Sequence, residues 1–408
     1  MRDVQKGLVE ALVETFTTRG LAIVAGLLVT IVTTKYLSLD QRGAYVLAVT
    51  VSATACQLGN LGLHGANTYY AAKHPYMIPE LVGNSLVVSL ALGAVTATAI
   101  VWLAPFLGYD EYGPRLMHVV AISMAPAILL VLLQNLALGA HDLKTYNGSE
   151  MLFRYGALSL MFALVYFEQR KPELIFATSI LSSVATVAFI WIRLSSKFLP
   201  IQTSWDLFKK SINFGYRAYL SSLLNFGITR FGLLYVAKKY APEDLAIYSI
   251  AMVFFDLVSM IPQVVAGIFF PRVVSIENPK EQMRFAYLTA LFVGLAVTVV
   301  SALVAILLPH VIPRLFEAQY LPAATIFWYL VPALVFTAIN SIFMNYFAAN
   351  GLPAVVIYAP AIGLAAHMML MKYAFVGNGL TGVATSMSLA AILIFSMALI
   401  KSFEKRRD

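Results

Sequence analysis

Long apolar runs separated by short polar breaks fill the sequence from residue 17 to residue 401. About 20 apolar residues in helical conformation cross the hydrocarbon core of a membrane. Hydrophobic residues make up 60% of the chain and charged residues only 12%, whereas roughly a quarter of a soluble domain is charged. Strand-period alternation is absent, which excludes a transmembrane barrel. The sequence therefore predicts an all-α polytopic membrane protein.

The apolar runs predict about twelve transmembrane helices, at residues 17–36, 44–72, 80–106, 115–140, 149–167, 173–194, 212–237, 245–271, 284–308, 322–348, 352–372 and 379–401. No loop between these runs is long enough to fold as a separate domain. This argues against a membrane enzyme with an extramembrane catalytic domain.

The placement of Lys and Arg predicts the orientation of the chain. With a cytoplasmic N-terminus, eighteen of the 28 Lys and Arg residues fall on the cytoplasmic side, nine fall outside, and Arg230 lies within a span. Cytoplasmic loops are richer in these residues, so both termini are expected to be cytoplasmic. The net charge of +8 is then mainly an orientation signal, and we expect no nucleic-acid partner.

A polar, amphipathic segment at residues 195–211 divides the chain into an N-terminal lobe, 1–194, and a C-terminal lobe, 212–408. Short matches recur in the same order in both halves, although shared apolar composition is an alternative explanation. They are Lys35-Tyr36 with Lys239-Tyr240, Pro126 with Pro332, and Asn135 with Asn345. Six spans per half predict two six-helix lobes related by a pseudo-two-fold axis along the membrane normal. Transporters built this way bind substrate between the repeats and work by alternating access.

Charged residues inside apolar runs are expensive and therefore informative. Arg230 lies deep in the seventh predicted span and Asp256 deep in the eighth. An ion pair between them is one interpretation. We favour the other, in which the guanidinium of Arg230 binds an anion, because its planar fork fits phosphate oxygens. Arg19 is a second candidate, or an ordinary anchor at the cytoplasmic edge.

The second predicted span carries a stripe of polar side chains at helical spacing: Gln57, Asn60, His64 and Asn67. Gln263 continues the theme in the eighth span. Such residues cannot comfortably face lipid. They either line a water-filled cavity, where they would bind substrate, or bond to neighbouring helices; we favour the cavity.

Two other groups of residues have simpler interpretations. Glu150 and Arg154 follow Ser149, a candidate helix N-cap, and are interpreted as helix-start electrostatics. Seven tyrosines near the outer edge favour an interfacial aromatic belt over a sugar-binding platform: residues 36, 45, 109, 112, 240, 248 and 320.

The motifs of several protein classes are missing. The chain has no Walker-type ATP-binding sequence, so active transport would use an ion gradient or substrate flux. The six histidines lack metal-ligand spacing, and a single cysteine, Cys56, excludes an intramolecular disulfide. No cofactor or metal is expected.

Several segments resemble bacterial polysaccharide flippases, the Wzx-like members of the multidrug/oligosaccharidyl-lipid/polysaccharide exporter superfamily. They are 35–48 (KYLSLDQRGAYVLA), 58–67 (LGNLGLHGAN), 248–251 (YSIA), 261–263 (IPQ), 269–273 (FFPRV) and 315–320 (LFEAQY). The resemblance implies flipping of an undecaprenyl-diphosphate-linked oligosaccharide across the bacterial inner membrane. It implies a coupling ion, H+ or Na+, and glycan-assembly proteins as partners beside the membrane lipids.

The resemblance also assigns site residues. Arg230, with Arg19, would neutralise the diphosphate, while Gln57, Asn60, Asn67 and Gln263 would bond to sugar hydroxyls. Family members often carry an Asp-Arg pair in the seventh helix. This chain has Thr229-Arg230 there, and Asp256 is the nearest carboxylate for ion coupling.

Two other functions compete with the flippase. A multidrug or cation antiporter of the same superfamily has the same span count but needs membrane-embedded carboxylates. A membrane-embedded glycan polymerase usually needs a large outer loop, and the outer loops here are short.

Overall fold

The computed structural model describes residues 2–113, 115–351, 353–375 and 377–404, with side chains described from residue 17 to residue 403. All regular elements in these ranges are helical. The chain forms two compact units, Met1–Tyr219 and Leu220–Asp408. The all-helical membrane fold predicted from the sequence is confirmed.

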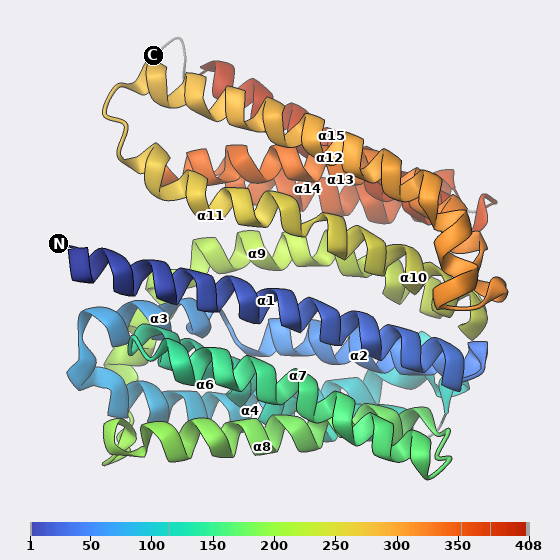
Figure 1. Cartoon of the computed structure of the whole chain (residues 1–408), viewed down its shortest axis with the longest axis horizontal. Coiled ribbons are helices and arrows are strands. Elements are labelled where there is room, and N and C mark those ends of the chain that lie inside the picture. The colour runs from blue at the N-terminus through green and yellow to red at the C-terminus, as the bar shows by residue number, and fades with distance from the viewer. Residues whose placement is uncertain (1, 114, 352, 376, 405–408) are drawn as a thin grey trace. The chain divides into compact units, whose positions relative to one another are not determined.

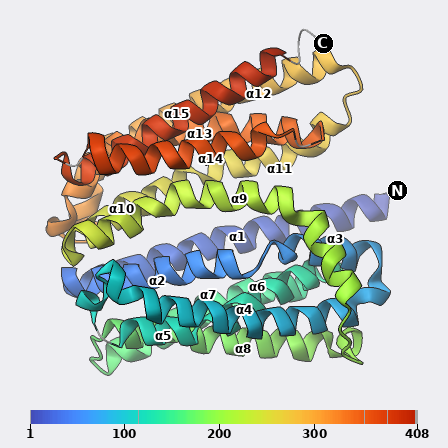
Figure 2. The same ribbon diagram turned by 180° about the vertical axis from the view of Figure 1, so that it is seen from behind.

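The N-terminal unit is a bundle of long helices that lie side by side in both views (Figures 1 and 2). Its elements are α1 (Arg2–Tyr36), α2 (Leu39–Gly59), α3 (Leu63–Lys73), η1 (Pro75–Met77), α4 (Ile78–Leu107), η2 (Tyr109–Tyr112), α5 (Leu116–Ile122), α6 (Met124–Gly139), α7 (Leu143–Tyr166) and α8 (Pro172–Phe198). Leucines of α4, α6 and α8 form its main core.

The long helix α9 (Trp205–Lys239) belongs to both units, because the division falls after Tyr219. The C-terminal unit continues with α10 (Pro242–Val258), α11 (Met260–Val274), α12 (Pro279–Leu315), η3 (Ala318–Tyr320), α13 (Pro322–Ala349), α14 (Val355–Met369), the π-helical turn η4 (Leu370–Ala374) and α15 (Gly379–Glu404).

The same order of elements occurs twice along the chain. Each time a long helix is followed by a broken helix pair, a second long helix and a short 3-10 turn: α1, α2–α3, α4 and η2 in the first half, and α9, α10–α11, α12 and η3 in the second. Proline stands in the first turn of α4, α8, α10, α12 and α13, where its missing N–H costs nothing. This repeated order is what an internal duplication predicts.

Among the described residues, ten helices are long and apolar enough to cross a membrane, and the bent pair α2–α3 makes eleven if it counts as one span. The helix α7 is outside this set because its N-terminal half is polar. Its 24 residues extend about 36 Å, enough to cross the hydrocarbon core. With α7 included, the helices correspond to the twelve predicted spans.

The segment that joins the halves packs on the N-terminal unit. The amide of Asn84 on α4 donates to the carbonyl of Ser204 at 2.9 Å and accepts from the Ser204 N–H at 3.1 Å. Leu207 joins the core of this unit, and Phe208 packs on a second cluster there. Residues 212–219, which the sequence interpretation assigns to the C-terminal lobe, also group with the N-terminal unit.

Candidate functional site

The deepest charged residues of the C-terminal unit are paired with each other. The Arg230 guanidinium on α9 lies 2.9 Å from a carboxylate oxygen of Asp256 on α10. The two side chains are 27% and 45% exposed. The ion pair that the sequence left as the less favoured interpretation is therefore present, and both partners remain accessible at their surfaces. Anion binding by Arg230 stays a prediction.

The second predicted span is not one continuous helix. The bend between α2 and α3 is 53°, and Leu61 and Gly62 between them have positive φ angles of 49° and 74°. The polar stripe from Gln57 to Asn67 is thus divided between two helices. Sequence periodicity could not reveal this, because the pair Gly59 and Gly62 is also compatible with close packing of a straight helix.

Asn60 lies at this bend and stabilises it. It is buried, its side-chain oxygen accepts from the Gly62 N–H at 2.8 Å, and His64 Nδ1 lies 3.0 Å from the same oxygen. Its Nδ2 donates to the Cys56 carbonyl at 3.2 Å. The structure thus brings together two predicted site residues, Asn60 and His64, in local contacts of the helix break.

Asn67 connects three helices. It is buried on α3, and its Nδ2 donates to Ser85 Oγ on α4 at 3.0 Å and to the Leu132 carbonyl on α6 at 3.3 Å. These are the interhelical bonds of the alternative interpretation. Binding of a sugar by Asn60 or Asn67 would require exchange of these bonds.

The other predicted polar residues are more accessible. Gln57 is half-buried at the end of α2, and its carbonyl accepts from the Tyr219 hydroxyl at 3.1 Å. Gln263 on α11 and Arg19 on α1 are exposed. Glycan contacts of Gln57, His64 and Gln263 stay predictions, as does the choice for Arg19 between anion site and anchor.

A second ion pair lies on α7, and the sequence interpretation of its position is wrong. The N-cap is Asp142, whose side chain accepts from the Thr145 N–H at 3.0 Å, and not Ser149. Because α7 begins at Leu143, Arg154 lies about 17 Å from its start and is not a helix-start residue. Its Nε is 2.6 Å from a Glu150 oxygen, and the side chains of Arg154 and Glu150 are 42% and 25% exposed.

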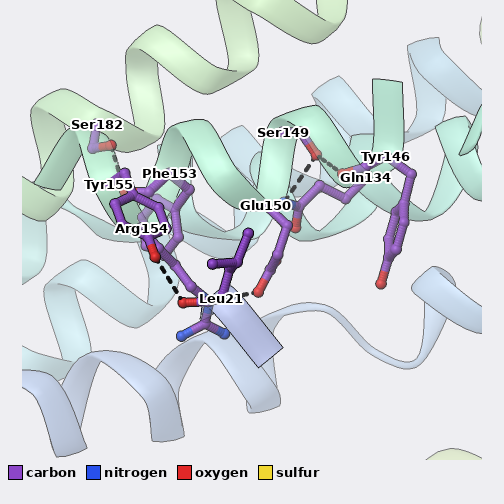
Figure 3. Close-up of polar contacts among 9 residues, drawn as sticks. All are labelled: Leu21, Gln134, Tyr146, Ser149, Glu150, Phe153, Arg154, Tyr155 and Ser182. Atoms are coloured by element: carbon purple, nitrogen blue, oxygen red, sulfur yellow. Dashed lines mark hydrogen bonds and ion pairs between the residues drawn. The ribbon is translucent and has the colours of Figure 1, made fainter. Parts of the chain in front are cut away.

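Contacts around this pair hold α7 in place (Figure 3). The Tyr155 hydroxyl donates to the Leu21 carbonyl on α1 at 3.1 Å, and Gln134 on α6 donates to Ser149 Oγ at 3.2 Å. Ser182 on α8 donates to the Phe153 carbonyl at 2.7 Å. Arg154 therefore lies near the middle of α7, a helix that is bonded to α1, α6 and α8. The signal in the sequence was the i, i+4 pair itself, and the error was the helix boundary.

The start of α7 also carries a perturbed carboxyl group. Burial raises the pKa of Asp142, but hydrogen bonds from Thr145 and the positive charges of Lys197 and Arg193 outweigh this effect, and the pKa lies below its ordinary value. The carboxylate form of this N-cap is thus favoured.

Four of the predicted belt tyrosines lie inside the protein. Tyr248 and Tyr320 are fully buried, and Tyr109 and Tyr112 are nearly so. A belt residue places its ring at the headgroup level, so the belt interpretation is wrong for these four. They pack between helices.

Comparisons with known proteins agree with this fold. A family model described as polysaccharide biosynthesis protein matches residues 32–325. No curated protein sequence matches the chain.

Solved structures match over nearly the whole chain. An inward-facing multidrug resistance MATE family transporter of the MOP superfamily is 16% identical, with a TM-score of 0.75 over 97% of this chain and 99% of that chain. The lipid II flippase MurJ in an inward closed conformation is 13% identical, with a TM-score of 0.67 over 96% and 87%. The eukaryotic MATE transporter AtDTX14 is 16% identical, with a TM-score of 0.63 over 96% of each chain.

The family match and the solved structures agree on the fold, which is that of a multidrug resistance MATE family transporter and of the lipid II flippase MurJ. The chain belongs to the polysaccharide biosynthesis protein family.

Proposed function

We propose that the chain is a flippase that moves an undecaprenyl-diphosphate-linked oligosaccharide from the cytoplasmic to the outer leaflet of the bacterial inner membrane by alternating access. Both termini then lie in the cytoplasm. The observation that carries the proposal is the accessible, ion-paired arginine within a long helix, Arg230 in the C-terminal unit, together with a second such arginine, Arg154, in the N-terminal unit.

The depth of these arginines supports a polar path. Arg230 lies nine residues before the end of α9 at Lys239, which is about 14 Å along the helix. An arginine at the bilayer centre costs about 2.5–3.5 kcal/mol on insertion scales. Because such residues avoid lipid, we expect the exposed parts of Arg230 and Arg154 to face water within the transporter.

The chemistry of the pair suits a diphosphate. A guanidinium forms two parallel hydrogen bonds to a carboxylate or to a phosphate with similar geometry. Asp256 can therefore hold Arg230 while no substrate is bound, and a diphosphate can replace it. The hydrocarbon tail of the substrate stays in the bilayer, so only the diphosphate and the sugars need the polar path.

Ion coupling is the second part of the proposal. Protonation of Asp256 would release Arg230 for the diphosphate, which links proton binding to substrate binding. Asp256→Asn should then transport at a rate that no longer depends on an imposed pH gradient. An unchanged gradient dependence would reduce Asp256 to a structural partner of Arg230.

A drug or cation antiporter is the alternative function. The accessible carboxylates Asp256 and Glu150 favour it, because a cationic drug would pair with either one. In the structure each of these carboxylates already has an arginine within 3 Å, and this neutralisation favours the flippase.

Glycan export in cells that lack their own flippase tests the proposal. Arg230→Ala should abolish export while membrane insertion stays intact, and Arg230→Lys should retain part of it. Arg314→Ala, which removes an exposed arginine at the end of α12, is the matched control. Full export by the Arg230→Ala variant, or drug efflux without glycan export by the unmodified chain, would overturn the flippase assignment.

A further inference from the structure

One histidine of the C-terminal unit is completely buried among membrane helices. His367 on α14 has no exposed surface. Its Nδ1 lies 2.9 Å from Ser386 Oγ on α15, and its ring lies 6.4 Å from the ring of Phe231 on α9. His367 lies seven positions before the end of η4, and Ser386 lies seven positions after the start of α15. Both therefore lie about 10 Å along the helix from these ends.

The hydrogen bonds determine which nitrogen of His367 carries the proton. The Ser386 hydroxyl has one hydrogen, and it donates to the Val383 carbonyl at 2.7 Å. That carbonyl can only accept, so the contact between Ser386 Oγ and His367 must use the hydrogen on Nδ1. The neutral imidazole is thus protonated at Nδ1, and Nε2 carries a lone pair.

This lone pair has no partner. Among the described residues, no donor lies within hydrogen-bonding distance of His367 Nε2, and the hydroxyl of Tyr248 on α10 is buried and unpartnered as well. The Tyr248 hydroxyl lies against Gly232, the residue after Phe231, at 3.0 Å from the position of a built Cβ atom. Two unsatisfied buried polar groups therefore flank the same turn of α9. Each such group destabilises the protein unless it finds a partner.

The chemistry of this place fits a proton better than a metal ion. No group of three metal-ligating side chains occurs in the part of the chain that the structure describes, and Na+ prefers several oxygen ligands. Arg230, the residue before Phe231 on α9, is paired with Asp256 on α10, and η4 carries the exposed Lys372. The carboxylate of α9 itself, Asp206, lies about 37 Å along the helix from Phe231, and the described side chains of α14 and α15 include no carboxylate.

We propose that Nε2 of His367 is a second proton-binding site of this transporter. Charging a buried imidazole is unfavourable, so protonation favours a conformation in which Nε2 reaches water. The element that can rearrange is the π-helical turn η4, because such turns are frequent at functional sites. It starts three residues after His367, and its Met371 carbonyl accepts from the Tyr235 hydroxyl at 3.1 Å. The coupling of this proton to transport rests on the proposed function; the binding of the proton does not.

Proton binding is measured directly on the purified full chain in lipid nanodiscs. Nitrogen-15 spectra of labelled histidine are recorded from about pH 4 to pH 8, the range in which histidine changes charge. The His367 signal is identified by its loss in His367→Gln, and His310→Gln, which changes an exposed histidine of α12, is the control. Titration of Nε2 with Nδ1 protonated throughout supports the proposal. An Nε2 that stays unprotonated over the whole range overturns it.

The Ser386→Ala variant tests the tautomer and keeps the histidine. Loss of the acceptor should let the proton exchange between the two nitrogens, so the Nδ1 signal should shift toward the Nε2 signal. An unchanged spectrum would contradict the assigned hydrogen bonds and with them the site.

Transport measurements test the coupling. In vesicles with an imposed pH gradient, His367→Gln should lose the acceleration by the gradient that His310→Gln keeps. Equal acceleration in both variants would overturn the coupling role while the flippase assignment stands. Absence of any flipping by the unmodified chain would overturn the proposed function, and the titration would still decide whether His367 binds a proton.

Discussion

Gly62 at the break between α2 and α3 offers the sharpest test of the packing in the N-terminal unit. A Cβ atom added there would lie 2.5 Å from Tyr219 Cβ, and the φ angle of Gly62 is +74°. The left-handed conformation costs a non-glycine residue about 1–2 kcal/mol, and forcing an extra carbon into a packed site costs about 1–3 kcal/mol. Gly62→Ala should therefore lower the free energy of unfolding by about 2–5 kcal/mol.

A thiol-reactive fluorescent dye reports this loss. Cys56 is the single cysteine of the chain and packs on the apolar cluster beside the break, so its reaction with the dye during heating follows the unfolding of α2. Gly65→Ala is the matched control, because nothing lies within 4 Å of its added Cβ and its φ angle is ordinary. If Gly62→Ala unfolds at the wild-type temperature, or if Gly65→Ala loses as much, the helix break is not held as the structure describes.

Three further predictions concern the same unit. Asp142→Asn should lower the unfolding temperature most at neutral pH, because the folded-state pKa of Asp142 lies below its unfolded value. The added stability is fully present above the unfolded pKa of about 4, and variant and wild type should unfold together only when the pH falls below the lowered folded-state pKa. Asn67→Ala should lower the free energy of unfolding by about 1 kcal/mol, measured with the same dye. This loss should exceed that of Ser85→Ala, because Asn67 also bonds to the Leu132 carbonyl. Arg154→Ala should reduce flipping about tenfold or more, since one charge-assisted hydrogen bond contributes about 1.5–3 kcal/mol; unchanged flipping would restrict the anion site to Arg230.

The membrane class and the span positions could be predicted because they depend on composition and on the length of apolar runs. Helix breaks could not, because they depend on contacts far away in sequence: the bend at Gly62 is fitted to Tyr219. The start of α7 was missed because its first turn is polar. Hydropathy averaged along the sequence places the start of the span at residue 149, whereas the capping residue Asp142 places the start of the helix at Leu143.

The candidate site shows the same division. Arg230 and Asp256 could be identified from the cost of a charge in an apolar run, and their pairing could be anticipated from neighbouring spans. The contacts of Asn60 and Asn67 could not be predicted, because the same amide suits a cavity or a bond inside the protein. For Asn67, only the positions of Ser85 and Leu132 decide between the two. His367 has no signal in the sequence, since a lone histidine in an apolar run does not reveal an unpartnered nitrogen.

Flipping by the purified chain in proteoliposomes shows whether transport depends on the diphosphate and on Arg230. A fluorescent oligosaccharide is attached to a polyprenyl chain through a diphosphate, and a second probe carries the same sugar through an uncharged link. The account predicts that the wild-type chain moves only the diphosphate probe between leaflets and that Arg230→Ala moves neither. Equal movement of the two probes, or movement of the diphosphate probe by Arg230→Ala at the wild-type rate, would contradict it.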